Sequence, residues 1–408
     1  MPKRVCVIGA GAAGLAAAKH SLAHGLEVQV FEQTSQVGGT WVYSEQTGCH
    51  SSMYQNLKTN LPKEVMQFKD IPFRDDLPSF LTHEEVLEYL QEFARGLPIF
   101  FNQTVENVER IEDKWKVTTH HGEGITEHFF DIVFVCNGHY FQPNNPYENA
   151  EFQGKLIHSH DYRRASDYTN QDVIVIGAGP SGIDIALQLS ETAKSITLIS
   201  RKATYPTLPN NVSQISQHVQ RVIPEGVETD DGTIVNADSI IVSTGYFYKY
   251  PFLSESILRV KENNQLVSPI FEHVVHADYP ESLYFIGLNL VTITFPLFEY
   301  QIQMALAFAT GKAPIPDREV LLDFEKNQIE HQKQRGLDTR FYHLLQNEQW
   351  EYLARIAKLG QFEEWPFMKT IENITTYLQE TRKSDVIGYK NINFELSEDQ
   401  MDYKVIRC

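Results

Sequence analysis

The chain has 408 residues, 42% hydrophobic and 22% charged, so it is long enough to form two or more domains with buried cores. Its 35 Lys and Arg residues against 53 Asp and Glu residues give a formal net charge of −18, which would repel nucleic acids and anionic membranes over much of the surface. These values argue against a polyanion-binding protein, although a local basic pocket is compatible with them.

Signals for export, membrane insertion or disulfide scaffolding are weak in this sequence. No run of about 18 apolar residues occurs, so we expect no membrane span. The first predicted strand begins almost directly after Met1, which leaves no room for a signal peptide. We therefore expect a soluble protein, cytoplasmic as the sequence stands and secreted if a signal peptide has been removed. The four cysteines are too few and too scattered for a disulfide framework: Cys6, Cys49, Cys136 and Cys408.

A nucleotide-binding motif opens the chain. The apolar run VCVIG is followed by Gly9, Gly11 and Gly14 at the spacing G-x-G-x-x-G, by an Ala-rich helix pattern, and by a second strand, VQVFE, that ends at Glu32. The first glycine permits a sharp turn, the second lets the backbone approach a pyrophosphate, and the third lets the helix pack closely on the strand. The pyrophosphate then lies at a helix N-terminus, whose N–H groups favour negative charge.

The residues after this motif indicate which dinucleotide it binds. Glu32 can accept hydrogen bonds from ribose hydroxyls, and its charge would repel the 2′-phosphate of NADP, so the site suits FAD or NAD. The stretch VGGTW, with Gly38 and Gly39, lets the backbone pass close to a bulky cofactor. FAD is therefore the predicted ligand. Trp41 is expected either beside the flavin or nicotinamide or in the core.

A second motif of the same kind follows the strand DVIVIG. Gly177, Gly179 and Gly182 repeat the glycine spacing, Ser181 stands between the last two, and an amphipathic helix pattern follows. This repeat predicts a second dinucleotide site.

The strand SITLISRK of the second motif ends in Ser200, Arg201 and Lys202, where the first motif ends in an acid. Arginine makes forked, charge-assisted hydrogen bonds to phosphate oxygens, and a serine hydroxyl adds a donor. The charge therefore predicts an NADPH site. The alternative is that Arg201 and Lys202 only form a solvated turn.

Strand-like runs flank the second motif and suggest how the domains are arranged. FFDIVFVCNGHY precedes it and ADSIIVSTGYFY follows it, each ending in a glycine turn; SLYFIGL then offers a strand with Gly287 at its end, and FPLFEYQIQMALAFATGK a helix behind Pro296. From about Pro314 the pattern is helical and charged. The predicted fold is α/β with two Rossmann-like dinucleotide-binding domains, the NADPH domain inserted in the FAD domain, and C-terminal helices. The predicted divisions are an FAD-binding domain at 1–165, an NADPH-binding domain at 166–250, and a return to the FAD domain plus a helical cap at 251–408.

The segment FQGKLIHSHDYR resembles the F-x-G-x-x-x-H-x-x-x-Y fingerprint of flavin-containing monooxygenases, carried here by Phe152, Gly154, His158 and Tyr162. The resemblance extends to VGGTW, TNLPKEVMQFKDIPF, STGY and LYFIGL. Baeyer–Villiger monooxygenases usually end the fingerprint in Trp, so the Tyr favours oxidation of nitrogen or sulfur. The chain is short between the second motif and STGY and lacks a hydrophobic C-terminal anchor. In this it looks like the soluble insect branch, with the pyrrolizidine alkaloid N-oxygenases of plant-feeding insects as the suggested likeness.

The resemblance implies an NADPH-dependent flavin monooxygenase. In this family NADPH reduces the flavin, O2 adds at flavin C4a, and a soft nucleophile attacks the distal oxygen of the C4a-hydroperoxyflavin, which the protein protects from water. The expected substrate is a small amine, alkaloid or thioether, with N-oxygenation of tertiary amines or alkaloids such as pyrrolizidine alkaloids favoured. No nucleic acid or membrane partner is expected, and a homo-oligomer is allowed. The alternatives are an NADPH oxidase-type flavoprotein that releases hydrogen peroxide and a non-catalytic FAD- and NADP-binding protein.

The resemblance also assigns roles to single residues. Asn60, in LKTNLPKE, matches the family's catalytic asparagine, whose amide faces the flavin and forms hydrogen bonds without titrating; its alternative role is in a turn before Pro62. His158 and Tyr162 are expected to set the join between the domains rather than transfer protons. Cys49 has no neighbouring cysteine, which disfavours a disulfide reductase, and no metal site is expected. The other implied cofactor contacts are Ala13, Gly39, Thr40, Trp41, Val105, Thr244, Gly245, Gly287 and Leu288.

Overall fold

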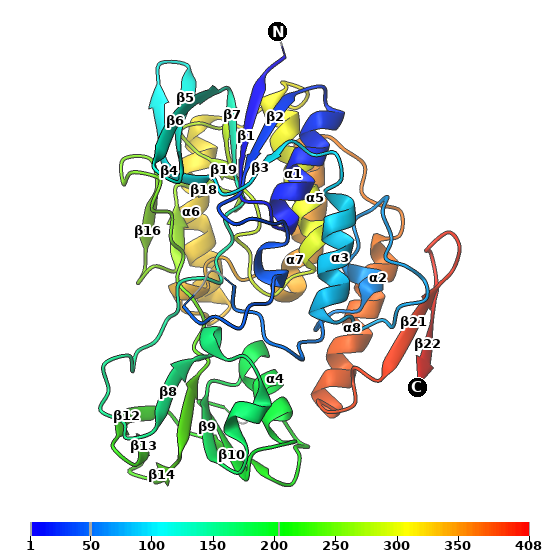
Figure 1. Ribbon diagram of the computed structural model, residues 1–408. Helices are drawn as coiled ribbons and strands as arrows, with labels where there is room; N and C mark the ends of the chain where they lie inside the picture. Colours follow the sequence, from blue (N-terminus) through cyan, green and yellow to red (C-terminus); the bar gives the residue numbers. More distant parts are fainter. Residues whose placement is uncertain (1, 49–50, 203–204, 408) are drawn as a thin grey trace.

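The computed structural model describes residues 2–48, 51–202 and 205–407. Its larger sheet has the strand order β18-β19-β20-β7-β1-β2-β3, in which β20, β7, β1, β2 and β3 run parallel and β18 to β20 form an antiparallel edge (Figure 1). The strands of this sheet are β1 (Arg4–Ile8), β2 (Glu27–Phe31), β3 (Ile99–Phe100), β7 (Ile132–Val135), β18 (Ile270–Phe271), β19 (Val275–His276) and β20 (Leu283–Phe285).

Both faces of this sheet are covered, which explains why β1 is apolar throughout. Val5 and Val7 belong to the core shared with the helices, whereas Cys6 and Ile8 belong to the core shared with a three-stranded sheet, because successive side chains point to opposite faces. Figure 1 shows the helices on one side and β4–β6 on the other. The helices are α1 (Ala12–Ala23), α2 (Lys63–Met66), α3 (His83–Phe93), α5 (Thr294–Ala309), α7 (Gln349–Gly360) and α8 (Met368–Ser384), and the three strands are β4 (Thr104–Ile111), β5 (Lys114–His121) and β6 (Gly124–Phe130).

A second, five-stranded sheet has the order β11-β10-β9-β15-β8 and is parallel throughout. It lies below the larger sheet in Figure 1, with α4 against it. All its strands lie between two parts of the chain that build the first sheet, so it is inserted in the sequence of that sheet. The elements are β8 (Lys155–His158), β9 (Asp172–Ile176), α4 (Pro180–Leu189), β10 (Ser195–Ser200), β11 (Val212–Ser216), β15 (Ser239–Val242) and the small antiparallel sheet β12 (Val219–Ile223), β13 (Gly226–Thr229) and β14 (Ile234–Asn236).

The chain enters the second sheet earlier than the predicted division after residue 165. Strand β8 pairs in parallel with β15 from Lys155 to His158, because Leu156 and Ile157 continue the apolar surface beside that fully buried strand. The domain limits 1–165, 166–250 and 251–408 stay predictions.

The C-terminal part contains the expected helices and two hairpins that were not expected. Helices α6 (Arg318–Gln334), α7 and α8 follow a hairpin of β16 (Arg259–Lys261) and β17 (Leu266–Ser268). Helix α5 begins at Thr294, two residues before Pro296. The helix tolerates this proline because the N–H groups of the first turn have no partner inside the helix. The chain ends in the hairpin β21 (Ile392–Leu396) and β22 (Tyr403–Arg407), drawn in red in Figure 1.

The observed α/β architecture, with two parallel sheets and C-terminal helices, confirms the predicted fold class. Within the described residues, no helix combines the length and the apolar character that a bilayer span requires. Cys6 and Cys136 are buried free thiols, and burial raises the pKa of both. Cys49 and Cys408 lie outside the described residues.

Candidate functional site

The first glycine loop joins β1 to α1 and has no space for a Cβ atom at Gly9 or Gly14. A Cβ atom on Gly14 would lie 1.9 Å from the carbonyl oxygen of Gly9. Gly9 itself has φ of 99°, and its Cβ would lie 2.7 Å from the carbonyl oxygen of Cys136, which directly follows the neighbouring strand β7. The nearest atom to a Cβ on Gly11 is the Cα of Gly39, at 3.6 Å, so the VGG stretch passes directly beside the loop. The structure therefore brings these four glycines together.

Helices α1 and α4 both start with an open N-terminus. Gly11 is the N-cap of α1 and Gly179 the N-cap of α4; within the described residues neither helix has a side-chain cap or an acid in its first turn. Ala13 and Ser181 lie half-buried in these first turns. The first N–H groups of a helix have no partner inside the helix, and an anion satisfies them well. Both ends fit the pyrophosphate of a dinucleotide.

The acid that ends β2 is held against the first glycine loop. Glu32 is 6% exposed; its Oε2 accepts from the N–H of Ala10 at 2.8 Å, and its Oε1 accepts from the N–H and the hydroxyl of Thr34, both at 2.8 Å. The backbone oxygen of Glu32 accepts from the N–H of Gln103 at 2.9 Å, which places the start of β4, with buried Val105, at the same point. A carboxylate has about four acceptor positions, so Glu32 can also accept from ribose hydroxyls.

The second glycine loop, between β9 and α4, repeats the geometry of the first. A Cβ on Gly182 would lie 1.9 Å from the carbonyl oxygen of Gly177, and a Cβ on Gly177, where φ is 104°, would lie 2.4 Å from the carbonyl oxygen of Ser243. Gly179 differs, because no described atom lies within 4 Å of its Cβ position. A pyrophosphate group can therefore approach the backbone at Gly179.

Two unpaired cations follow the end of β10. Arg201 and Lys202 are exposed, and neither takes part in an ion pair with any described residue. Ser200 donates its hydroxyl proton to the carbonyl oxygen of Lys202 at 2.6 Å, which leaves its oxygen as an acceptor. The arrangement fits an additional phosphate because two positive side chains are available, whereas the Ser200 hydroxyl proton is engaged and does not supply the further donor expected from the sequence.

The residues after β15 contact the segment that connects the two sheets. Thr244 donates its hydroxyl proton to the carbonyl oxygen of Asn144, and Gly245, with φ of 86°, accepts from the N–H of Asn144 at 2.9 Å. Because Ser243 lies directly against Gly177, Thr244 and Gly245 sit beside the second glycine loop.

Apart from Asn60, the residues predicted beside the flavin lie in two short segments. Gly39 to Trp41 form a 3-10 turn, in which Thr40 is exposed and Trp41 packs half-buried against the main core. Gly287, with φ of 83°, donates its N–H to Gln301 Oε1 at 2.9 Å, and Leu288 accepts from the hydroxyl of Tyr248 at 2.5 Å. Those two backbone groups are therefore already engaged within the protein.

Asn60 has a partner that the sequence did not indicate. Its Oδ1 accepts from the hydroxyl of Tyr389 at 3.1 Å, although the two residues are 329 positions apart. The next residue, Lys390, pairs with Asp184 of α4 at 2.9 Å. No local pattern identifies such contacts, because each depends on where the C-terminal segment folds back.

The two fingerprint residues His158 and Tyr162 are both buried. His158 ends strand β8 of the second sheet, and Tyr162 follows the short 3-10 turn after it. His158 Nδ1 accepts from the N–H of His160 at 3.1 Å, and the ring of Tyr162 packs against those of Tyr54 and Tyr168. Burial, with the neighbouring His160 second, lowers the pKa of His158 to about 4. This packing favours the domain-joining interpretation over proton transfer.

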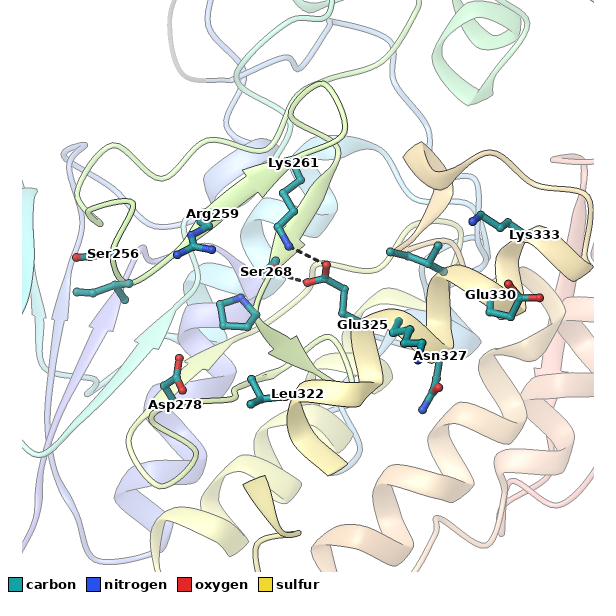
Figure 2. Close-up of a pocket in the computed structure, with 14 residues that line it drawn as sticks. Ser256, Arg259, Lys261, Ser268, Asp278, Leu322, Glu325, Asn327, Glu330 and Lys333 are labelled. Carbon is teal, nitrogen blue, oxygen red and sulfur yellow. Dashed lines mark hydrogen bonds and ion pairs between the residues drawn. The ribbon is translucent and has the colours of Figure 1, made fainter. Parts of the chain in front are cut away.

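A cavity of about 850 Å³ opens elsewhere, between β16, β17 and α6. Figure 2 shows Glu325 at its centre, accepting from Lys261 at 2.7 Å and from Ser268. None of the residues predicted to bind a cofactor lines it. In the described part of the chain, no group of His, Cys, Asp and Glu side chains is arranged to hold a metal ion.

Comparison with known proteins places the chain in a family. Residues 2–207 and 206–364 match the family described as flavin-binding monooxygenase-like. Flavin-containing monooxygenase FMO GS-OX4 of Arabidopsis thaliana is 35% identical over 399 residues, which cover 89% of this chain and 86% of that protein. S-allyl-L-cysteine S-oxygenase from Allium sativum has a similar structure, with a TM-score of 0.87, 29% identity, and coverage of 98% of this chain and 97% of that one. Tmm from Pelagibacter sp. strain HTCC7211 gives a TM-score of 0.86 at 26% identity, covering 99% and 96%.

These relatives come from plants and a bacterium, so the predicted likeness to insect alkaloid N-oxygenases stays a prediction. The predicted enzyme class and both cofactors are confirmed, and the non-catalytic alternative is wrong. The chain belongs to the flavin-binding monooxygenase-like family and is an oxygenating enzyme that uses FAD and NADPH.

Proposed function

We propose that this enzyme transfers oxygen to the sulfur of a small thioether. The observation that carries the proposal is its similarity, over 98% of the chain, to S-allyl-L-cysteine S-oxygenase. The sequence alone favoured nitrogen, and N-oxygenation of tertiary amines, including pyrrolizidine alkaloids, is the second candidate. The net charge of −18 favours that candidate, because an acidic surface attracts cationic amines.

In this proposal the first glycine loop holds FAD. The N–H groups at the start of α1 would bind the pyrophosphate beside Gly11, and Glu32 would accept from the ribose hydroxyls and exclude a 2′-phosphate. Ala13, Gly39, Thr40, Trp41, Val105, Gly287 and Leu288 are the further proposed contacts. Bound FAD supplies the activation of O2 and the transfer of one oxygen atom.

The second loop would hold NADPH. The start of α4 would bind its pyrophosphate beside Gly179, and Arg201 and Lys202 would donate to its 2′-phosphate. Ser181, Ser200, Thr244 and Gly245 are the further proposed contacts. Asn60 would hold a hydrogen bond at the reacting side of the flavin, since its amide donates without supplying an acidic proton.

A product assay tests the preference for sulfur. Purified enzyme with FAD, NADPH and O2 is given S-allyl-L-cysteine, a tertiary amine or a pyrrolizidine alkaloid, and the oxygenated products are measured by mass spectrometry. The carbon analogue of the thioether, with CH2 in place of sulfur, is the control. We expect kcat/KM for the thioether to exceed that for either amine by about tenfold or more, a difference that one well-fitted substrate group can supply. A preference for the amine would establish the second candidate, and hydrogen peroxide equal to the NADPH consumed with every compound would show that none of the three is a substrate.

A further inference from the structure

The amide of Asn60 is held by a side chain from the far end of the sequence. The Tyr389 hydroxyl donates to Asn60 Oδ1 at 3.1 Å. Tyr389 is 3% exposed, and its ring meets that of Phe80 edge-on at a centroid distance of 5.7 Å, so the hydroxyl has a fixed position. Because the amide oxygen accepts this bond, the Nδ2 group of Asn60 is directed to the opposite side as a donor.

The segment that carries Tyr389 is anchored to the Asn60 loop by the next residue. Lys390 Nζ donates to the carbonyl oxygen of Lys58, two residues before Asn60, at 2.9 Å, and pairs with Asp184 Oδ1, also at 2.9 Å. The Lys390 and Asp184 side chains are only 15% and 14% exposed. An ion pair this sheltered, with additional hydrogen bonds on both sides, specifies geometry better than a surface pair.

Asp184 connects this arrangement to the second glycine loop. It lies on α4, the helix whose N-terminus is the proposed NADPH pyrophosphate site. Its Oδ2 accepts from the Tyr54 hydroxyl at 2.7 Å and from Gln188 Nε2 at 3.1 Å, and Gln188 Nε2 also donates to the carbonyl oxygen of Asn56 at 3.2 Å. The loop 54–60 is therefore hydrogen-bonded both to α4 and to the C-terminal segment.

We propose that Tyr389 is a positioning residue for oxygenation: its hydroxyl orients the Asn60 amide, and the Lys390–Asp184 pair keeps that contact in register with α4. The inference rests on the proposed role of Asn60 beside the flavin. It makes the segment between α8 and β21 a part of the site, although that segment lies more than 300 residues from Asn60 in the sequence.

The substitution Tyr389→Phe tests this proposal in the FAD-loaded enzyme. It keeps the contact with Phe80 and removes only the hydroxyl, so the unfolding midpoint should move by less than about 4 °C. Tyr377→Phe is the matched control, since it removes a hydroxyl from α8 at a ring that contacts Phe394 and not Asn60. The readouts are the visible circular dichroism of bound FAD and the hydrogen peroxide released per NADPH.

We expect Tyr389→Phe to shift the circular dichroism of bound FAD in the same direction as Asn60→Ala and to raise the peroxide yield by about threefold, as loss of one hydrogen bond allows. Tyr377→Phe should change neither. The double variant Asn60→Ala/Tyr389→Phe should match Asn60→Ala alone, because Tyr389 acts through Asn60.

The proposal would be overturned if the increases in peroxide yield of the two single variants multiplied in the double variant. It would also be overturned if Asn60→Ala altered the circular dichroism of bound FAD and Tyr389→Phe did not. An unchanged Asn60→Ala enzyme would refute the role of Asn60 and the positioning with it, while the preference for sulfur is decided separately by the product assay. If Asn60→Ala does not retain FAD, hydrogen exchange of residues 54–62 in Tyr389→Phe decides: faster exchange than in Tyr377→Phe supports the proposal, and equal exchange overturns it.

Discussion

The two glycine loops have nearly the same backbone and opposite chemistry at the strand that follows. In each, the third glycine stands where a Cβ would lie 1.9 Å from the carbonyl oxygen of the first, and each leads into a helix with no side-chain cap from the described residues. The first loop is completed by Glu32, buried and held by three hydrogen bonds. The second is completed by Arg201 and Lys202, exposed and without ion pairs among the described residues.

The difference separates what any dinucleotide requires from what distinguishes one from another. In the proposed sites the glycines and the helix N-terminus would serve the pyrophosphate, which FAD and NADPH share. A fixed, buried acid is organised before binding and suits a cofactor that stays. Exposed Arg and Lys side chains lose rotamer freedom each time a phosphate binds, which suits a cofactor that is exchanged at every turnover.

The largest expected effect on stability comes from adding a Cβ atom at the third glycine of either loop, Gly14 or Gly182. An alanine normally stabilises a helix by about 1 kcal/mol relative to glycine. Gly14→Ala and Gly182→Ala should instead destabilise by about 3 kcal/mol or more, because the added Cβ meets backbone that cannot move aside. Gly14→Ala should yield protein without bound FAD, whereas Gly182→Ala should spare FAD and abolish reduction by NADPH. Thermal unfolding and the visible absorbance of the purified proteins measure both effects.

The control for these variants is Gly179→Ala, whose Cβ meets no described atom within 4 Å. Its unfolding midpoint should fall much less than that of Gly182→Ala, because only the N-cap preference for glycine over alanine is lost. A Gly14→Ala protein that is as stable and as yellow as the parent would show that the loop tolerates a side chain and that the two loops are not equivalent.

The basic end of β10 gives the next largest effect. Arg201→Ala should raise KM for NADPH by about tenfold to a hundredfold, the value of a hydrogen bond to a charged group, and leave KM for NADH unchanged. Arg221→Ala is the control, since Arg221 is an exposed arginine of the same sheet region that pairs with Glu228 at 2.7 Å. An equal loss with both cofactors would mean that Arg201 does not recognise the 2′-phosphate.

Both loops could be predicted from the sequence because their signals are local: glycines at fixed spacing, an apolar strand before them, and a charged residue at the end of the next strand. The inserted order of the sheets followed from the similar runs on either side of the second loop. Strand β8 itself was not predicted, because a four-residue strand with two half-buried positions has almost no periodic signal.

The C-terminal hairpin and the contact between Tyr389 and Asn60 were missed for different reasons. INFEL alternates apolar and polar residues, but YKVIR breaks the alternation at Ile406, so only one of the two strands carries a clear hairpin signal. The Tyr389 contact had no such signal, because it depends on the chain returning after α8 to the loop 54–60. Local motifs therefore predicted the two glycine loops, whereas only the fold brings Tyr389 to Asn60.

The smallest expected effect extends the comparison to one histidine beside each sheet. Burial lowers the pKa of His139, after β7, and of His158, at the end of β8, to about 4. An unfolded histidine titrates near 6.5, so between pH 6.5 and 4 the unfolded chain binds more protons, and stability falls as the pH falls. At pH 5.5 the loss is about 1 kcal/mol for each group. His158→Gln should reduce the decrease in urea-unfolding free energy between pH 7.5 and 5.5 by that amount, and His218→Gln, at an exposed position near the same sheet, should not. If His158→Gln leaves the decrease in unfolding free energy between pH 7.5 and 5.5 unchanged, the His158 imidazole is already protonated at pH 5.5 in the folded protein.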